Sequence, residues 1–374
     1  MSTSLTSRFT ALDVFRGMTI CLMIIVNTPG NDDTTYSPLH HALWNGFTPT
    51  DLVFPSFMFA VGNAMSFVTK KWSNMPERAI LAKIVKRSLL IFVLGFLMYW
   101  FPFFHQTASG WALNPFSDTR IFGVLQRIAI AYFIASLMVY YLKPSTNIIL
   151  SILILILYWP VLYFFGDGPD PLNIHTNAVL KLDTFLIGTR HLYMGEGFPF
   201  DPEGLLSTIP SIVNVIAGYF AGLYIQKKGK SFEGLSKLLL AGFALLIIGY
   251  WWNLGFPINK KLWTSSFVVH AVALDLMFLS LIIYYTDFKN KTAGVYFFEV
   301  FGKNPLFIYL LSELMVVVLY MVQVGDVSLY RWLYLHVFAL AGAYFGSLLF
   351  SISYMLFCWL VGLILDKNRI YIRV

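Results

Sequence analysis

The sequence predicts an all-α integral membrane protein, a polytopic bundle of transmembrane helices, on three observations. Hydrophobic residues make up 58% of the 374 residues and charged residues only 12%, against roughly 25% charged residues in an ordinary soluble domain. The mean hydropathy is +0.70. Apolar runs of about 18 or more residues recur along the chain, and a helix of that length crosses a hydrocarbon layer about 30 Å thick.

These apolar runs are expected to form ten spans. The first carries Asp13 and Arg16 in its first turns and has no small-residue cleavage site after it, so we expect a retained helix rather than a signal peptide. The last is long enough to tilt or to project from the membrane, and a break within it would make the count eleven. The ten runs are about 10–28, 51–69, 87–104, 121–142, 147–165, 208–226, 236–254, 264–286, 304–324 and 336–365.

Basic residues in the loops predict the orientation. With the amino terminus in the cytoplasm, the cytoplasmic segments hold seventeen Lys and Arg, and the opposite face holds six, which are Arg120, Lys181, Arg190, Lys260, Lys261 and Arg331. Because cytoplasmic loops of membrane proteins are enriched in Lys and Arg, both termini are expected to be cytoplasmic. Much of the net charge of +7 therefore reflects topology, and no nucleic acid is expected as a partner.

One integral membrane domain is expected over residues 1–374, with an extracytoplasmic cap formed by the loop at about 166–207. The predicted orientation places this loop, residues 29–50 and the loop before the eighth span on the same face of the membrane. All three loops contain polar and aromatic residues. We therefore expect them to converge on one extracytoplasmic site.

Charged and amide side chains inside the spans are costly in hydrocarbon and are usually paired or functional. Asp13 and Arg16 are three residues apart on one helical face and can neutralise each other. Arg127 has no acid nearby in its own span, so it needs a carbonyl set, an anionic ligand or an acid from another helix. Two such acids are available, Asp275 and Glu313. Two amides are expected to bond across helices, Asn27 and Asn304.

Two adjacent histidines, His40 and His41, precede the second span. Imidazole titrates near neutral pH and acts as a base or nucleophile on acyl or phosphoryl donors when a neighbouring group sets its tautomer. Adjacent residues point in different directions, so at most one histidine is expected at a reacting centre. Asp51, at the start of the second span, can orient one of them. The alternative is a solvated or packed histidine.

A metal site is the competing hypothesis, because several His, Asp and Glu residues fall on this face. Their spacings match no compact zinc pattern such as HExxH, so no metal is expected. Cys21 and Cys358 lie inside apolar runs and are expected to be packing residues. Gly218 and Gly222 in "GYFAG" form a small-xxx-small pattern, a weak signal for helix packing.

The outer loops combine aromatic rings with hydrogen-bonding side chains, a mixture that suits a sugar. Rings stack on the apolar face of a sugar, while amides and carboxylates bond its hydroxyls. The alternative is the interfacial belt that tryptophan and tyrosine form in membrane proteins. Lys260 can meet an anionic group or lie in solvent. The candidate substrate-binding residues are Trp44, Asp201, Glu203, Asn259, Lys260 and Trp263.

Six motifs in order, from about residue 8 to 315, resemble the heparan-alpha-glucosaminide N-acetyltransferase family of the lysosomal membrane acetyltransferase and its bacterial relatives. They are "RFTALDVFRGMTICLMIIVNTPG", "HALWNGFTPTDLVFPSFMFAVG", "RIFGVLQRIAIAYF", "DPEGLLSTIPSIVNVIAGYFAG", "PINKKLWTSSFV" and "GKNPLFIYLLSE". The resemblance implies that acetyl from cytoplasmic acetyl-CoA reaches the amino group of an extracytoplasmic amino sugar or glycan. It also implies that the active histidine lies in "HALWNG", which aligns on His41.

The implied reaction is acyl transfer, either by direct attack of an amine deprotonated by His41 or through an acetyl-imidazole. Asn45 is expected to stabilise the oxyanion, and Asp51 to complete the catalytic set. The candidates for binding acetyl-CoA are Arg16, Arg127 and Asn304. Besides the amino sugar or glycan acceptor, the expected partners are membrane lipid and a second copy of the chain in a homodimer.

The sequence departs from the lysosomal enzyme in two places. No large lumenal domain is expected before the first matching helix, and "YLLSE" near Glu313 contains no histidine. Both departures favour a bacterial inner membrane, with the His41 loop on its outer face, and an acceptor other than heparan. The alternative function is a transporter or flippase for a glycan or lipid-linked sugar, which is disfavoured because inverted repeats are not evident.

Overall fold

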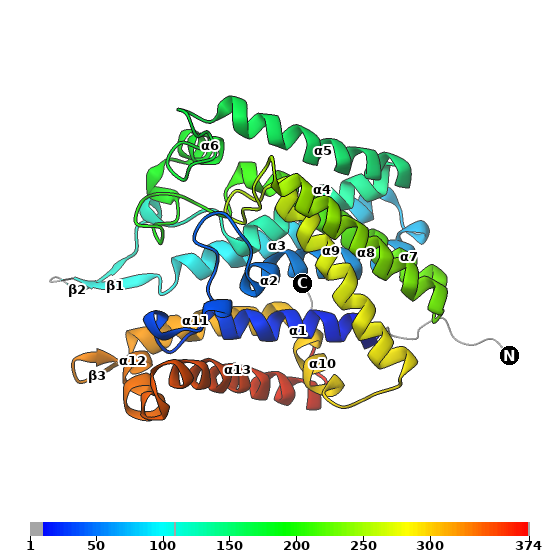
Figure 1. The fold of residues 1–374 in the computed structure, drawn as a ribbon. Helices are drawn as coiled ribbons and strands as arrows, with labels where there is room; N and C mark the ends of the chain where they lie inside the picture. Colours follow the sequence, from blue (N-terminus) through cyan, green and yellow to red (C-terminus); the bar gives the residue numbers. More distant parts are fainter. Residues whose placement is uncertain (1–9, 108–109, 373–374) are drawn as a thin grey trace. The chain divides into compact units, whose positions relative to one another are not determined.

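The chain is mostly helical in its computed structural model, which describes residues 10–107 and 110–372 (Figure 1). Helices account for 73% of the structure. Within the described residues, sheet is limited to two antiparallel hairpins, β1 (Phe104–Thr107) with β2 (Gly110–Leu113) and β3 (Gln323–Val324) with β4 (Val327–Ser328). The prediction of a helical membrane protein is therefore confirmed.

The predicted apolar runs all fall on helices. The α-helices of the described residues are α1 (Thr10–Asn27), α2 (Val53–Val68), α3 (Glu77–Trp100), α4 (Val124–Tyr141), α5 (Pro144–Phe165), α6 (Ala178–Ile187), α7 (Leu205–Lys228), α8 (Phe232–Asn253), α9 (Ser265–Ile283), α10 (Val295–Lys303), α11 (Pro305–Met321), α12 (Leu329–Leu333) and α13 (Ala343–Lys367).

Eight of the described helical segments are long and apolar enough to cross a membrane, and the bent pair α10–α11 would make nine. The remaining predicted run corresponds to α3, whose first half carries Lys83, Lys86 and Arg87. These charges make α3 less apolar than the other runs, although its 24 residues are enough to span. The number of crossings stays a prediction.

Two predicted spans have different ends in the structure. The run at 304–324 is preceded by α10, and the axes of α10 and α11 differ by 83°. Pro305 begins α11, in the first-turn position that proline tolerates. The run at 336–365 does not form one helix from its start, because α13 begins only at Ala343, after Gly342 with φ of +102°. The long final span is thus shorter than predicted.

Contacts divide the chain into two compact units. Within the described residues, the first unit holds 10–40, 224–243 and 273–372, and the second unit holds 41–107, 110–223 and 244–272. His40 and His41 fall on opposite sides of this division. The prediction of a single membrane domain with a cap stays a prediction.

The first unit is organised around α1, which packs against α10, α11 and α13. The predicted Asp13–Arg16 pair is present, with Arg16 Nη1 3.6 Å from Asp13 Oδ1. The same nitrogen donates to the carbonyl of Gly302 at 3.1 Å. The charged pair inside α1 therefore fastens this helix to the end of α10.

In the second unit, α2 and α7 meet with their backbones in close contact. A Cβ added to Gly218 would lie 1.9 Å from the carbonyl oxygen of Phe59, and one added to Gly62 would lie 1.8 Å from that of Val215. Glycine is required at such crossings because any side chain would hold the helices apart. The packing role predicted for "GYFAG" is confirmed.

The loop at 166–207 contains α6 and shares a hydrophobic core with α5 and with residues 254–264. Tyr158, Phe200 and Phe256 are buried in this core. Trp44 packs against this core, and its Nε1 donates to the carbonyl of Leu172 at 3.0 Å. The segment that contains His41 is thereby attached to the 166–207 loop, as expected for loops that converge on one site.

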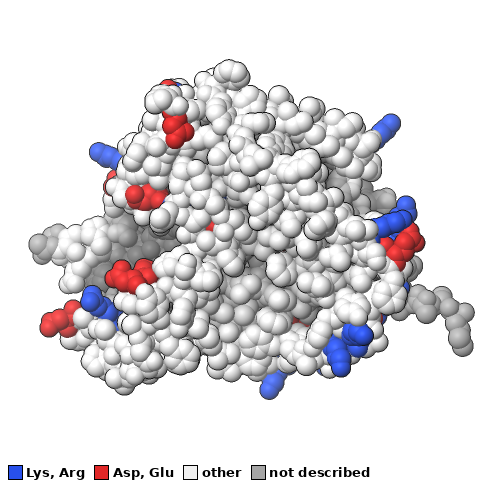
Figure 2. Space-filling model, in the orientation of Figure 1, with Lys and Arg blue, Asp and Glu red and all other residues white. Residues whose placement is uncertain are grey.

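Outward-facing residues of the spans are largely apolar. On the face drawn in Figure 2, most surface side chains are neither acidic nor basic. Exposed apolar residues are numerous on two helices, with Ile149, Ile152, Ile156 and Leu157 on α5 and Leu240, Phe243 and Trp251 on α8. Exposure of apolar side chains to lipid carries no free-energy penalty, whereas their exposure to water is unfavourable.

Candidate active site

The site begins with Asp51, a fully buried residue in the short 3-10 helix Pro49–Leu52 that leads into α2. Its Oδ2 accepts hydrogen bonds from the Thr48 backbone N at 3.0 Å, the Thr48 hydroxyl at 3.1 Å and the Ala42 backbone N at 3.1 Å. The segment 42–48 is therefore folded around this carboxylate. The second oxygen, Oδ1, remains for another partner.

That partner is His41, whose Nδ1 lies 2.7 Å from Asp51 Oδ1. A carboxylate only accepts hydrogen bonds, so Nδ1 carries the proton and donates it, and Nε2 keeps its lone pair. His40 points elsewhere, with its Nε2 3.2 Å from the carbonyl of Thr35. The structure thus separates the two histidines and places one of them on the buried acid.

A second loop, 254–264, is bound to the His41 segment at two points. The backbone N of Gly46 donates to the carbonyl of Ile258 at 2.8 Å, and Asn259 Nδ2 donates to Asn45 Oδ1 at 3.1 Å. Gly46 has a φ of +123°, a conformation that favours glycine. Asn259 also accepts the Leu262 backbone N on Oδ1 at 2.8 Å. These bonds set the position of the next residue, Lys260.

Lys260 lies against the imidazole of His41. Its Nζ is 3.1 Å from Nδ1, 3.3 Å from Nε2 and 3.9 Å from Asp51 Oδ1. The neighbouring Lys261 turns away and pairs with Glu196, with 2.6 Å between Nζ and Oε2. Two adjacent lysines that the sequence does not distinguish thus have different partners.

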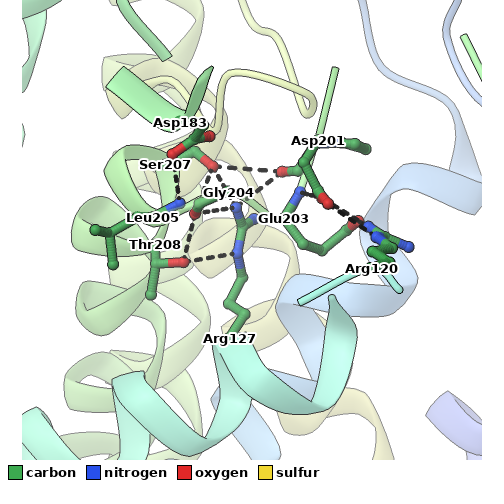
Figure 3. A network of polar contacts seen from close by, with 10 residues as sticks. Arg120, Arg127, Asp183, Asp201, Glu203, Gly204, Leu205, Ser207 and Thr208 are labelled. Carbon is green, nitrogen blue, oxygen red and sulfur yellow. Dashed lines mark hydrogen bonds and ion pairs between the residues drawn. The ribbon is translucent and has the colours of Figure 1, made fainter. Parts of the chain in front are cut away.

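A second polar network in the same unit is centred on Arg120 (Figure 3). Its Nε and Nη2 donate to the two oxygens of Asp201 at 2.8 and 2.6 Å, and Nη2 is also 2.6 Å from Glu203 Oε2. The guanidinium lies against the rings of Tyr99 and Tyr193, 4.8 and 4.6 Å from their centres. Planar, bidentate and stacked contacts are typical of arginine.

Arg127 is fully buried beside this network. It donates to the carbonyl of Pro202 at 2.8 Å and to the hydroxyls of Ser207 and Thr208 (Figure 3). Of the partners expected for Arg127, the structure therefore contains the set of carbonyl groups. The other candidates, Asp275 and Glu313, lie in the first unit, and an ion pair of either with Arg127 stays a prediction. Glu313 accepts a bond from Asn27 at 3.3 Å within the first unit, as expected for an amide that bonds across helices.

His41 and the charged groups beside it have shifted pKa values. Burial lowers the pKa of His41, and the Lys260 ammonium lowers it further, while the hydrogen bond to Asp51 and the charges of Asp51 and Glu203 oppose this. Because the side chain is 45% exposed, water screens part of the burial effect and part of the effect of each neighbouring charge. The imidazole is therefore held neutral near pH 7.

Lys260 and Glu203 shift in accordance with their neighbours. Burial lowers the pKa of Lys260, against the charges of Asp51 and Glu203. Burial acts to raise the pKa of Glu203, but Arg120, Arg127 and Lys260 hold it below its usual value. Glu203 is therefore an ionised carboxylate that acts electrostatically on both His41 and Lys260.

The structure brings some predicted site residues together and places others apart. Asn45, Asp51, Asn259 and Lys260 gather at His41, with Trp44 packed nearby on the core of the 166–207 loop. Two predicted substrate contacts are enclosed in protein. Trp263 is 0% exposed and its Nε1 donates to Asn214 Oδ1 at 3.1 Å, while Asp201 is 1% exposed and paired with Arg120.

Arg16 and Asn304, predicted to bind acetyl-CoA, lie in the first unit. Arg16 pairs with Asp13 of its own helix and donates to the carbonyl of Gly302 in α10. Asn304 is fully buried and holds the segment after α13, donating to the carbonyl of Ile370 at 2.9 Å and accepting the backbone N of Ile372 at 2.8 Å. This differs from the expected bond across helices.

Two residues of the site were not predicted. Thr48 could have been found from "TPTD", because Ser or Thr followed three residues later by an acid is the capping-box pattern of a helix start. Arg120 had no such signal. The sequence marks it only as a loop charge, because its partners lie 81 and 83 residues further along the chain.

No group of three or more His, Cys, Asp and Glu side chains suited to a metal ion occurs among the residues described by the structure. Both cysteines are buried and free, in agreement with a packing role.

Residues 8–251 match the protein family described as "Heparan-alpha-glucosaminide N-acetyltransferase, catalytic". Two curated relatives carry the name heparan-alpha-glucosaminide N-acetyltransferase. The Mus musculus protein is 28% identical over 365 residues, with 83% of this chain and 54% of the relative covered. The Homo sapiens protein is 30% identical over 367 residues, with 83% and 53% covered.

The chain spans about half the length of these relatives. The matched range contains His41 and Asp51 together with Arg120, Arg127 and Glu203, whereas Lys260 lies beyond it. The match covers more than half of the chain. The chain therefore belongs to the heparan-alpha-glucosaminide N-acetyltransferase catalytic family.

Proposed function

We propose that this protein is a transmembrane acetyltransferase that moves acetyl from cytoplasmic acetyl-CoA to the amino group of an extracytoplasmic amino sugar or glycan. The observation that carries the proposal is the contact of 2.7 Å between His41 Nδ1 and the buried carboxylate of Asp51, in a chain of this family. This contact leaves Nε2 as the reactive nitrogen. An oriented, neutral imidazole is suited to acyl transfer.

The reaction joins the acetyl group to the acceptor nitrogen and releases the CoA thiol. In the direct route, Nε2 of His41 removes a proton from the acceptor amine, which attacks the thioester carbonyl, and the proton then passes to the departing sulfur. In the covalent route, Nε2 itself attacks the thioester, and the amine attacks the acetyl-imidazole. Asp51 serves both routes, because it stabilises the ring orientation and the positive charge that develops on it.

Unpaired polar atoms in the second unit support a binding path for the donor. Arg127 Nη1 and Asn214 Nδ2 are buried donors without a hydrogen-bond partner among the described residues. Both residues contact Trp263. The guanidinium of Arg127 stacks on its ring at 4.6 Å from the ring centre, and Asn214 Oδ1 accepts a hydrogen bond from its indole N. Buried donors normally have partners, so carbonyl or phosphate oxygens of acetyl-CoA are proposed as theirs.

The acceptor is proposed to bind beside His41. Trp44 and Asn45 follow His41 closely in sequence, and Asn259 is bonded to Asn45. Amides of this kind can contact sugar hydroxyls or, in the case of Asn45, the oxyanion. Glu203 is an ionised carboxylate whose charge acts on the same site and would favour an amine.

The topology belongs to this proposal. Ten crossings with both termini in the cytoplasm would place the His41 segment on the outer face of a bacterial inner membrane. Eight long apolar helical segments, the bent pair α10–α11 and the 24-residue α3 support that count. A basic excess in the predicted inner loops supports the orientation.

The test uses the full chain, purified in detergent, with radiolabelled acetyl-CoA and a panel of amino sugars that begins with glucosamine. The wild type is expected to form labelled product, His41→Ala to form none, and His40→Ala, the adjacent matched control, to retain most activity. Equal loss in both variants would contradict the assignment of His41. Binding of acetyl-CoA without transfer to any amine would contradict the acceptor class.

A transporter or flippase is the second candidate, and one observation favours it. The break of 83° between α10 and α11 is the kind of interrupted helix that lines ion or substrate sites in transporters. Uptake of a labelled amino sugar by proteoliposomes, without acetyl-CoA and unchanged in His41→Ala, would support transport and contradict the acetyltransferase.

A further inference from the structure

The position of Lys260 on the His41 ring is unusual for a hydrogen-bonded pair. Its Nζ is almost equally distant from Nδ1 and Nε2, at 3.1 and 3.3 Å. The lone pair of an imidazole nitrogen points outward in the ring plane, so an ammonium bonded to Nε2 would be much farther from Nδ1. Equal distances place Nζ over the ring face. The Nε2 lone pair is therefore left for a reacting group.

This position is imposed by the surrounding backbone. The bonds Gly46–Ile258 and Asn45–Asn259 join the two loops on the residues that precede Lys260. On its other side, the Trp263 backbone N donates to the Lys260 carbonyl at 3.0 Å. The side chain of Lys260 is only 16% exposed, so it has little freedom to leave the ring.

Burying a cation against a ring that can itself become a cation is costly, so the arrangement needs compensation. The charges that act on His41 are those of Asp51, Lys260 and Glu203. Those that act on Lys260 are Asp51 and Glu203, which favour its ammonium, and Arg127 and Lys261, which oppose it. Asp51 and Glu203 thus stabilise the Lys260 ammonium beside His41, and this ammonium disfavours a second positive charge on the imidazole.

We propose that Lys260 is a positioning residue of the acyl-transfer reaction, whose ammonium over the His41 ring keeps the imidazole neutral and ready to react. This inference rests on the proposed function. In the direct route, a proton moves from the acceptor nitrogen to Nε2, and the bond between sulfur and the acetyl carbon breaks. Lys260 disfavours retention of that proton on the ring, so the proton passes to the departing thiolate.

The test measures the protonation of His41 directly. Diethyl pyrocarbonate acylates only the neutral imidazole, so the rate of His41 modification against pH, followed by peptide mass spectrometry, reports the pKa of this ring. Loss of the cation should raise the midpoint for Lys260→Met by about one pH unit. Lys260→Arg, which keeps the charge, should titrate like the wild type, as should the matched control Lys261→Met.

The acid limb of acetyl transfer should move with the modification rate. Lys260→Met should lose most activity on the acid side of the wild-type midpoint but little at about pH 8, because the neutral ring is abundant in both proteins at the higher pH. Lys260→Gln provides a second neutral variant if Lys260→Met is unstable. A midpoint that is unchanged or lowered in the neutral variants overturns the inference.

The two measurements separate this inference from the proposed function. Modification by diethyl pyrocarbonate requires neither acetyl-CoA nor an acceptor. A midpoint that depends on the charge of Lys260, in a wild type that transfers no acetyl, would support the electrostatic contact and contradict the acetyltransferase. Acetyl transfer by the wild type with no such dependence would support the acetyltransferase and overturn the role of Lys260.

Discussion

The His41 centre and the Arg120 network lie in the same unit and differ in how completely their charges are paired. Arg120 engages Asp201 through two bonds, Glu203 through a third, and two tyrosine rings. At the His41 centre, Asp51 is fully bonded, but the imidazole is 45% exposed and Lys260 Nζ is almost equally distant from its two nitrogens. Complete pairing of the charges indicates a structural network. An oriented imidazole with a free lone pair indicates a reactive group.

Glu203 connects the two regions. It is bonded to Arg120 in the paired network, and its charge acts on both His41 and Lys260. A structural network can therefore also set the electrostatic environment of a reactive group beside it. The two regions should respond differently to three substitutions.

The largest effect is expected for Asp51→Asn. An amide can present its NH2 to His41 Nδ1 and reverse the tautomer, and it loses the charge that stabilises the protonated ring. Transfer of acetyl should fall by roughly 10³-fold, within the range of general acid–base contributions. The measurement is kcat at saturating acetyl-CoA. Asp33→Asn, an exposed acid in the same stretch of chain, is the control, and equal loss there would contradict the comparison.

The next effect is on stability, from Arg120→Gln. This change leaves Asp201 and Glu203 buried without their cation, which costs about 3–5 kcal/mol when one partner of a buried pair is removed. The free energy of unfolding in detergent should fall accordingly. The control is Arg190→Gln, an exposed arginine on the 166–207 loop. A network that contributed only surface charge would lose under about 1 kcal/mol.

The smallest effect is expected for Glu203→Gln, and it has the opposite sign to Lys260→Met. The charge of Glu203 raises the pKa of His41, so its removal lowers that pKa. The ring then stays neutral to lower pH, and the acid limb of kcat/KM should move down by less than about one pH unit. Glu196→Gln, whose acid pairs with Lys261, should leave the limb in place. An unchanged limb for Glu203→Gln would show that this charge does not reach the ring, and an upward movement would contradict its sign.

Part of the site could be predicted from the sequence because it is local. Asp51 follows His41 by ten residues, and both lie in one motif, so the prediction that Asp51 can orient a histidine needed no tertiary information. The choice between His40 and His41 depended on the resemblance to a family. The structure then placed the two rings on different partners, Thr35 and Asp51.

Other residues could not be assigned in this way. Trp263 and Trp44 are both tryptophans in loops predicted to lie on the outer face, yet one is enclosed between Arg127 and Asn214 and the other packs at the 166–207 loop. Residue type states what a side chain can do. Its neighbours, which come from distant segments, decide whether it is available.

The sequence by itself determined the class of protein, the places of its helices, the family and the His41 motif, because hydrophobic length and motif spacing are properties of neighbouring residues. The tertiary structure alone decided that Lys260 rather than Lys261 lies on His41, at a separation of 219 residues, and that Arg120 pairs with acids 81 and 83 residues away. Hydrogen bonds and ion pairs need their atoms within about 4 Å, so they depend on which loops the fold brings together and not on their order in the chain.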